Sequence, residues 1–273
     1  MRETYLTHFG LREPPFTKEI PDGELWLPSS KQAVVDELVD AVEARSSVVL
    51  VGDPGVGKTC VLRAFRKRLP DSGFRLTYCH NVTLGRRDFY RQLCTALGLS
   101  PSVTAGAVFH AVATHVNELG NDRLHPVFLL DEAHLLHQDT LDHLHILLNY
   151  EWDSRALLSL VLVGLPELLD RLNMRRNRSL FSRLHRRLRI DPLVPADTAE
   201  YISMRLHRVG CDRDIFASDA VAMIHEAALG GMRDVDRLAT ASLRETARKK
   251  RKLVERDAVG RIIEIHTHGD AAA

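Results

Sequence analysis

An apolar run leads directly into a glycine-rich motif in the stretch Val48-Val49-Leu50-Val51-Gly52-Asp53-Pro54-Gly55-Val56-Gly57-Lys58-Thr59. Its first four residues are apolar and mostly β-branched, which predicts a short buried strand. The remainder has the spacing Gly-x-x-x-x-Gly-Lys-Thr, which is typical of a loop that binds phosphate. Glycines let the backbone N–H groups turn inward toward an anion, and the helix expected after the loop presents its positive end to the same anion. The stretch therefore predicts a nucleotide triphosphate site between a strand and a helix.

We expect ATP as the nucleotide and Mg²⁺ as its counterion. Lys58 would reach the β- and γ-phosphates and take part in catalysis, and the hydroxyl of Thr59 would bind Mg²⁺. The residues expected to contact the nucleotide in this segment are Gly52, Asp53, Pro54, Gly55, Val56, Gly57, Lys58, Thr59 and Cys60.

A second apolar run, Val127-Phe128-Leu129-Leu130, ends in Asp131 and Glu132. Nucleotide triphosphatases need a carboxylate at the end of a second buried strand to hold the magnesium shell. Asp131 is the candidate for this metal role. Glu132 is placed to polarise the attacking water as a general base. The sequence therefore predicts an ATPase.

The fourth expected strand ends in Gly164-Leu165-Pro166-Glu167, without an obvious Asn, Ser or Thr to sense the γ-phosphate. Asn149 and Glu167 are the alternatives for that role. The apolar side chain at Leu165 predicts slow hydrolysis, although it does not weaken the prediction of nucleotide binding.

On either side of this motif, expected strands alternate with expected helices up to about Pro195, which favours a parallel sheet covered on both faces. The strands are expected at 48–51, 74–80, 127–131, 158–164 and 188–190, and the helices at 30–44, 60–69, 87–97, 105–119 and 140–152.

After Pro195 only helices are expected, at 197–209, 218–229, 234–250 and 255–265, with Asp197 and Ser218 as N-caps. The predicted organisation is an N-terminal arm (1–30), an α/β core (31–195), an α-helical lid (196–266) and a disordered tail (267–273). The arm is rich in proline and aromatic residues, so it cannot be one helix, and its aromatic side chains are expected to dock on the main domain.

Composition limits the class of protein. The 273 residues are 45% hydrophobic and 27% charged, with a formal net charge of +1, as in folded globular proteins rather than disordered ones. Four widely spaced cysteines favour reduced thiols over a disulfide framework or a zinc site. No signal peptide or membrane-length apolar run is visible. We therefore expect a cytoplasmic protein without a membrane segment.

The sequence resembles the AAA+ ATPases of the ExeA type, with the related transposition ATPases TnsC, TniB, IstB and MuB. The resemblance spans nearly the whole chain and implies a three-layer AAA+ P-loop core followed by a small all-α lid. Besides the phosphate loop, the matching stretches are Tyr5 to Leu11 with Pro15-Phe16, Asp131-Glu132-Ala133-His134, Leu162 to Leu168, Ser179 to Leu184, Asp191-Pro192-Leu193 and Gly231 to Leu238.

The resemblance also implies roles for two arginines. Arg183 resembles the finger that one subunit inserts toward the γ-phosphate of its neighbour, with Arg187 as the alternative, and such a finger stabilises charge in the transition state. Arg233 resembles the lid residue that senses bound nucleotide. A finger acting in trans requires head-to-tail contact, so self-association into a ring or a helical filament is expected.

Two basic clusters predict a polyanionic partner, most simply double-stranded DNA. The segment 171–189 carries eight arginines and no acid, and residues 248–252 read Arg-Lys-Lys-Arg-Lys. Thr83 to Arg87 is a third candidate. The individual contacts expected with DNA are Thr83, Arg86, Arg87, Arg175 and Arg176. The alternative interpretation is that these runs are solvated helix faces or subunit contacts.

Three functions stay open from the sequence. The first is an ATPase that assembles on duplex DNA with ATP and recruits or regulates a transposase, and that hydrolysis disassembles. The second is a secretion-type ATPase that energises assembly of an envelope complex. The third is a nucleotide-gated interaction protein, or helicase loader, with slow hydrolysis.

Overall fold

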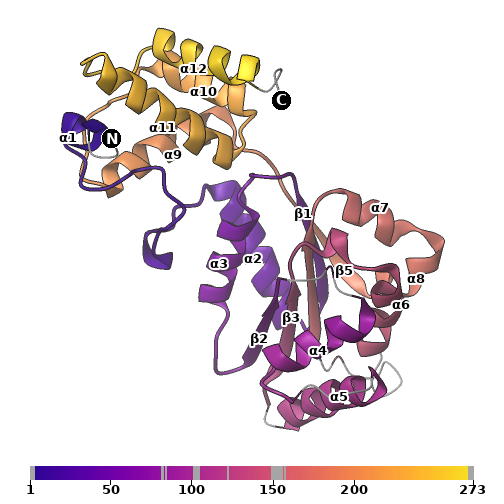
Figure 1. The fold of residues 1–273 in the computed structure, drawn as a ribbon. Helices are drawn as coiled ribbons and strands as arrows, with labels where there is room; N and C mark the ends of the chain where they lie inside the picture. The colour runs from indigo at the N-terminus through magenta and orange to yellow at the C-terminus, as the bar shows by residue number, and fades with distance from the viewer. Residues whose placement is uncertain are drawn as a thin grey trace. The chain divides into compact units, whose positions relative to one another are not determined.

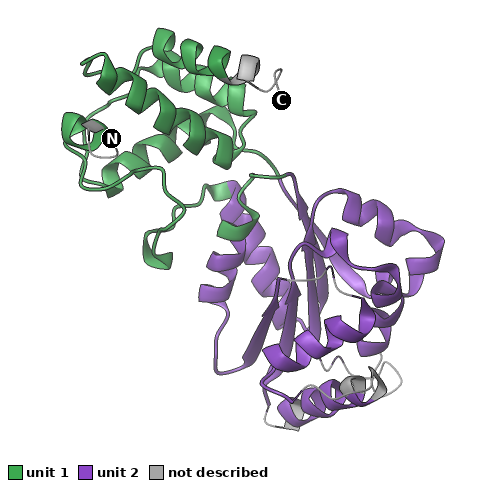
Figure 2. Ribbon diagram, in the orientation of Figure 1, with its two compact units in different colours: residues 1–29, 54–60, 191–273 green, residues 30–53, 61–190 purple. Residues whose placement is uncertain are grey.

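The computed structural model describes residues 4–80, 83, 85–100, 105–121, 123–148, 156 and 158–269 (Figure 1). The chain forms two compact units (Figure 2). We call residues 30–53 and 61–190 the sheet unit, and residues 1–29, 54–60 and 191–273 the helical unit. The division near residue 191 lies close to the boundary expected at Pro195, and the phosphate loop is grouped with the helical unit.

The sheet unit is built on five parallel strands in the order β2-β3-β4-β1-β5. The strands are β1 (Ser47–Gly52), β2 (Phe74–Cys79), β3 (His125–Leu130), β4 (Ser159–Gly164) and β5 (Leu184–Ile190). All six residues of β1, of β3 and of β4 are buried, as expected for parallel strands covered on both faces. The predicted α/β class with a parallel sheet is confirmed.

Helices cover both faces of this sheet. Alternate strand residues, which share one face of the sheet, pack in one buried cluster with apolar side chains from several helices. Val49 and Phe128 are examples. Those helices are α4 (Arg86–Ala96), α5 (Ala105–Asn121), α6 (Gln138–Leu147), α7 (Glu167–Asn173) and α8 (Arg178–Phe181). Helices α2 (Ser29–Glu43) and α3 (Lys58–Arg68) lie on the other side (Figure 1). The sequence pattern did not predict α7 and α8.

His125 begins β3 and is a buried titratable group of the sheet. The residue is 5% exposed, and its Nε2 lies 2.9 Å from Ser159 Oγ. Burial, helped by the nearby charge of Arg45, lowers the pKa of His125 from 6.5 to about 4. The neutral imidazole is therefore the form that the fold accommodates.

We expect the sheet unit to lose stability as pH falls from 6.5 toward 4. In this range His125 binds a proton in the unfolded chain but stays neutral in the folded protein. Above pH 6.5 this contribution is fully present, and its loss amounts to about 3 kcal/mol by pH 4. Urea unfolding at pH 7 and pH 4.5 measures it. His125→Gln keeps an amide nitrogen near Ser159 without titrating, so the pH slope of the variant should be smaller. Equal slopes in both proteins would contradict the assignment.

The helical unit contains α9 (Pro195–Arg208), α10 (Ser218–Ala228), α11 (Met232–Arg248) and α12 (Arg256–Gly269), as the pattern predicted apart from helix ends. The predicted N-caps were wrong. The N-cap of α9 is Val194, because Pro195 takes the first helical position, where its missing N–H costs nothing. The N-cap of α10 is Ala217, so Ser218 is already helical. Helix α12 continues to Gly269, so residues 267–269 of the predicted tail are helical, and 270–273 lie outside the described residues.

The N-terminal arm contains α1 (Thr4–Phe9) and a 3₁₀ turn, Asp22–Glu24, so it is not one helix. Its aromatic side chains pack on the C-terminal helices rather than on the main domain, which corrects the expectation. Phe16 meets Phe216 at 6.3 Å between ring centroids, and Trp26 meets Tyr201 at 5.8 Å. Buried residues of the arm and of α9 to α12 form one cluster, which is the core of the helical unit.

Candidate nucleotide site

The phosphate loop follows β1 directly, and α3 begins at Lys58. Gly55 and Gly57 have φ of +82° and +99°, a region that side chains disfavour, so the two glycines are needed for this backbone path. Gly55 O accepts a hydrogen bond of 3.3 Å from the backbone N–H of Arg233. Within the helical unit, the loop therefore contacts the residue that the resemblance implied as the lid sensor.

The absence of a side chain at Gly55 allows the backbone of the loop to lie close to Arg233. A Cβ at Gly55 would lie 3.2 Å from Arg233 Cβ. We expect Gly55→Val to weaken ATP binding at least tenfold, because valine meets both the positive φ and this contact. Titration with a fluorescent ATP analogue measures the loss. Gly85→Val is the control, since a Cβ there meets nothing within 4 Å and its φ of −59° suits any residue. Equal affinities in the two variants would contradict the prediction.

The acidic pair Asp131 and Glu132 follows β3 at the carboxyl edge of the sheet. The N–H of Asp131 donates to Cys79 O at 2.9 Å, which continues the pairing of β3 with β2 by one residue. Asp131 Oδ1 accepts the N–H of Glu132 at 2.9 Å, and Glu132 takes a left-handed conformation with φ of 54°. The chain therefore turns sharply at Glu132, and its side chain is 49% exposed.

Tyr78, in β2, is a residue of this edge that the sequence analysis missed. Its hydroxyl donates to Asp131 Oδ2 at 2.9 Å. Burial and the neighbouring carboxylate of Asp131 both raise the pKa of Tyr78, so the phenol keeps its proton. The sequence of β2 could have indicated that Tyr78 lies near the carboxyl end of its strand. Its contact with Asp131 could not be predicted, because it depends on β2 lying beside β3. Tyr78 therefore orients the carboxylate that we expect to serve Mg²⁺.

His134 connects the acidic pair to the end of β4. Its Nδ1 lies 3.5 Å from Glu132 Oε2 and accepts the N–H of Leu165 at 3.4 Å. Arg171 donates to the carbonyls of His134 and Leu136. Arg171 was expected to belong to a surface that binds a polyanion, and it holds this turn instead.

The end of β4 has the apolar residue that the sequence indicated. Leu165 offers its backbone N–H to His134, and Glu167 is the exposed first residue of α7. Asn149, the other alternative for a polar sensor, lies outside the described residues. The polar contact at this strand end therefore comes from the backbone.

Arg183, the expected finger, follows α8 in the sheet unit. Its side chain is partly buried and donates to Ser179 O at 2.9 Å. Arg187, the alternative, lies exposed in β5 with its guanidinium 4.0 Å from the centroid of the Phe181 ring. The Arg183 guanidinium therefore already binds a backbone carbonyl within the sheet unit.

The five predicted DNA contacts separate into two groups. Arg86 Nη1 lies 2.5 Å from His143 Nε2, and Arg176 Nη2 donates to Asp142 Oδ2 at 2.9 Å, so both guanidinium groups are engaged within the sheet unit. Arg176 is exposed as well, and so are the other three, which are Thr83, Arg87 and Arg175.

An exposed basic surface remains around Phe181. Arg175, Arg178 and Phe181 line a pocket of about 370 Å³ with Asn173, and Arg187 lies over the same ring. We call Arg175, Arg178 and Arg187 the arginine surface. None of the three forms an ion pair with a residue that the structure describes. Of these three arginines, only Arg175 was predicted from the sequence to contact DNA.

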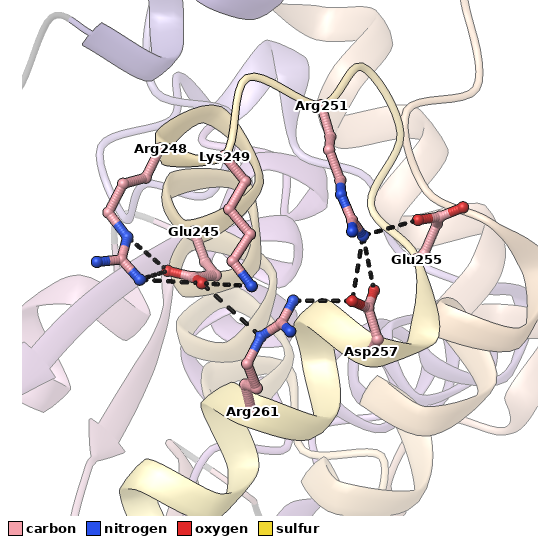
Figure 3. Close-up of polar contacts among 7 residues, drawn as sticks. All are labelled: Glu245, Arg248, Lys249, Arg251, Glu255, Asp257 and Arg261. Carbon is pink, nitrogen blue, oxygen red and sulfur yellow. Dashed lines mark hydrogen bonds and ion pairs between the residues drawn. The ribbon is translucent and has the colours of Figure 1, made fainter.

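The second basic cluster, at residues 248–252, is largely neutralised by acids of the helical unit (Figure 3). Arg248 and Lys249 pair with Glu245 at 2.9 and 3.3 Å. Arg251 pairs with Glu255 and with Asp257, each at 3.1 Å. The expectation of a polyanion site here is weakened, because three of the five cations already have carboxylate partners.

Comparisons with known proteins agree with this fold. Residues 41–172 match the model of a family described as an AAA domain. General secretion pathway protein A of Aeromonas hydrophila is 30% identical over 259 residues, which cover 93% of this chain and 47% of that protein. The chain therefore spans about half the length of this relative.

Solved structures show the same architecture. Drosophila ORC, bound to DNA, has a TM-score of 0.68 at 20% identity, covering 94% of this chain and 64% of that chain. The RuvB Holliday junction branch migration motor of Thermotoga maritima has a TM-score of 0.60 at 17% identity, covering 93% and 73%. At such identities the likeness shows the fold alone.

The sheet order, the phosphate loop and the match of residues 41–172 to the AAA domain model agree on an AAA-type P-loop fold. The similarity to general secretion pathway protein A fits the ExeA type that the sequence resembles. Closeness to the transposition ATPases stays a prediction. No helix among the described residues is both long and apolar enough to cross a membrane.

Proposed function

We propose that this protein binds and hydrolyses ATP with Mg²⁺. The observation that carries the proposal is the sheet edge: the phosphate loop leaves β1 at the edge where Asp131 and Glu132 follow β3. The loop suits a phosphate group because its positive-φ glycines turn the backbone inward and leave no side chain in the way.

Each residue has a role in this proposal. Lys58 and the backbone N–H groups of residues 52 to 60, apart from Pro54, bind the phosphates, Thr59 and Asp131 hold the metal shell, and Glu132 orients the attacking water. When bound, Mg²⁺ neutralises charge on the β- and γ-phosphates. Arg233 senses the nucleotide, supported by its hydrogen bond to Gly55.

The proposal extends to self-association, with Arg183 supplying positive charge to the nucleotide of a neighbouring subunit. The resemblance supports this role, and head-to-tail contact would produce a ring or a helical filament. Hydrolysis would then require two subunits, so the specific activity should rise with protein concentration. Activity per subunit that does not change over a hundredfold dilution would argue against it.

Duplex DNA is the assembly partner that the arginine surface favours. Arginine side chains without ion-pair partners bind phosphates and release counterions. On this proposal ATP-bound subunits assemble on DNA, the assembly recruits or regulates a transposase, and hydrolysis disassembles it. The transposase is supported only by the resemblance to the transposition ATPases.

A secretion-type role is the second candidate, favoured by the relative named general secretion pathway protein A. In this role the same nucleotide cycle would drive assembly of an envelope complex. Co-purification with a membrane-spanning partner, together with no DNA binding, would support this role over the first.

An electrophoretic mobility shift with ATP, ADP and a non-hydrolysable analogue separates the two. We expect duplex binding in the ATP-like state, and the double variant Arg175→Gln/Arg178→Gln should reduce the slope of log affinity against log salt by about two. Arg248→Gln/Lys249→Gln is the matched control, because those cations already pair with Glu245. Absence of duplex binding in all three nucleotide states would exclude the DNA proposal.

A further inference from the structure

One nitrogen of His134 lies between two groups that compete for it. Nδ1 accepts the backbone N–H of Leu165, at the end of β4, at 3.4 Å. The same atom lies 3.5 Å from Glu132 Oε2. The His134 side chain is 13% exposed, so most of the ring is shielded while its remaining surface can exchange protons with water.

The chemistry of imidazole makes the two contacts alternatives. To accept from Leu165, Nδ1 must be unprotonated, and the neutral ring then carries its proton on Nε2. To donate to the Glu132 carboxylate, Nδ1 must carry the proton, and the Leu165 N–H then loses its acceptor. The structure places Nδ1 within reach of both partners, and the Leu165 N–H is directed at it.

The surroundings hold His134 at this junction. A Cβ at Gly164 would lie 3.1 Å from His134 N and 3.2 Å from His134 Nδ1, so glycine permits the close approach of β4. Arg171 Nη2 donates to Leu136 O at 2.7 Å, and Nη1 donates to the carbonyl of His134. Both sides of the turn are thus fixed while Nδ1 keeps two candidate partners.

We propose that His134 is a positioning residue that links the end of β4 to the general base Glu132. When the Leu165 N–H withdraws, the proton on the ring relocates from Nε2 to Nδ1 through solvent, and Nδ1 donates to Glu132 and fixes its carboxylate. The strand end that lacks a polar side chain acts through its backbone. This inference rests on the proposed ATPase function and adds a residue to the same site.

Steady-state ATPase kinetics of three substitutions test the role. We expect His134→Ala to lower kcat by about 10- to 100-fold, as loss of an outer-shell partner typically does, with KM within twofold of wild type. His134→Asn places an amide near the position of Nδ1 and should recover most of kcat. His134→Gln places its amide near the position of Nε2 and should not. His137→Ala, an exposed histidine three residues away, is the control.

A spectroscopic readout is independent of turnover. Long-range ¹H–¹⁵N spectra distinguish protonated from unprotonated ring nitrogens, and His134→Asn assigns the His134 signal among the 14 histidines. We expect an unprotonated Nδ1 in the nucleotide-free protein and a protonated Nδ1 with a non-hydrolysable ATP analogue. The same spectra of Glu132→Gln should show weaker protonation of Nδ1, because the amide is a poorer acceptor than the carboxylate.

The outcomes separate the two proposals. Wild-type hydrolysis that Lys58→Ala abolishes, combined with equal kcat in the Ala, Asn and wild-type proteins at position 134, would overturn the role of His134 alone. So would an Nδ1 that is protonated, or unprotonated, in both nucleotide states. Absence of ATP binding and turnover in the wild type would overturn the ATPase function, and with it the role of His134.

Discussion

Lys58→Ala is expected to abolish ATP binding, with a loss of affinity of at least about 100-fold. Lys58 is the first residue of α3, where its ammonium adds a full charge to the partial positive charge of the helix end. A charge-assisted hydrogen bond to phosphate contributes about 1.5–3 kcal/mol, so the two that we expect from Lys58 to the β- and γ-phosphates contribute at least about 3 kcal/mol, which corresponds to about 100-fold in affinity. Isothermal titration with ATP and Mg²⁺ measures the change.

The control for this variant lies on the same helix. Lys67 is exposed in the last turn of α3, so Lys67→Ala removes a charge of the same kind far from the loop. Alanine is a good helix former at either position, so both variants should unfold at similar temperatures. Unchanged ATP affinity in Lys58→Ala would refute the assignment of the loop.

Glu132→Gln is expected to keep ATP binding and to lower turnover by about 10²- to 10⁴-fold, the usual contribution of a general base. The substitution keeps the shape of the side chain and removes its charge. The backbone turn should persist, because it depends on the N–H of residue 132 and on Asp131 Oδ1. Phosphate release under saturating ATP measures turnover, and sedimentation measures the assembled form that the variant should trap.

Glu167→Gln is the control for the base. Glu167 is an exposed carboxylate at the start of α7. Of the two alternatives for the sensor role, it is the one that lies among the residues that the structure describes. We expect its turnover within threefold of wild type. Full turnover in Glu132→Gln would remove Glu132 as the base, and a large loss in Glu167→Gln instead would identify the polar sensor that Leu165 does not provide.

The strands could be predicted because burial on both faces demands continuous apolar runs, as in Val48 to Val51. The arginine-rich segment after Gly164 contains α7 and α8. These helices were not predicted, because the many arginines interrupt the apolar pattern of the segment. There, Leu168 and Leu172 pack inward from one face of α7, and Leu180 packs inward from α8. The partner of the arm could not be predicted, because a local sequence pattern indicates that an aromatic side chain is buried but not which residues it packs against.

The phosphate loop and the acidic pair could be predicted because each is a contiguous motif. Tyr78 and the contact between His134 and Leu165 could not, because they depend on β3 lying between β2 and β4. Strand order is a property of the whole chain, so a local pattern cannot reveal it. Arg171 and Arg176 were interpreted by charge alone, and both find acceptors inside the sheet unit.

The position of β1 in the sheet has a consequence for biosynthesis. Its neighbours are β4 and β5, which follow it by more than 100 residues in the chain. While the chain is being made, β2 and β3 can pair first, and β1 waits without a partner until β4 leaves the ribosome. Strand β1, which leads into the phosphate loop, is therefore made early but paired late. A nascent chain that ends before residue 159 exposes this valine-rich strand to chaperones and to aggregation.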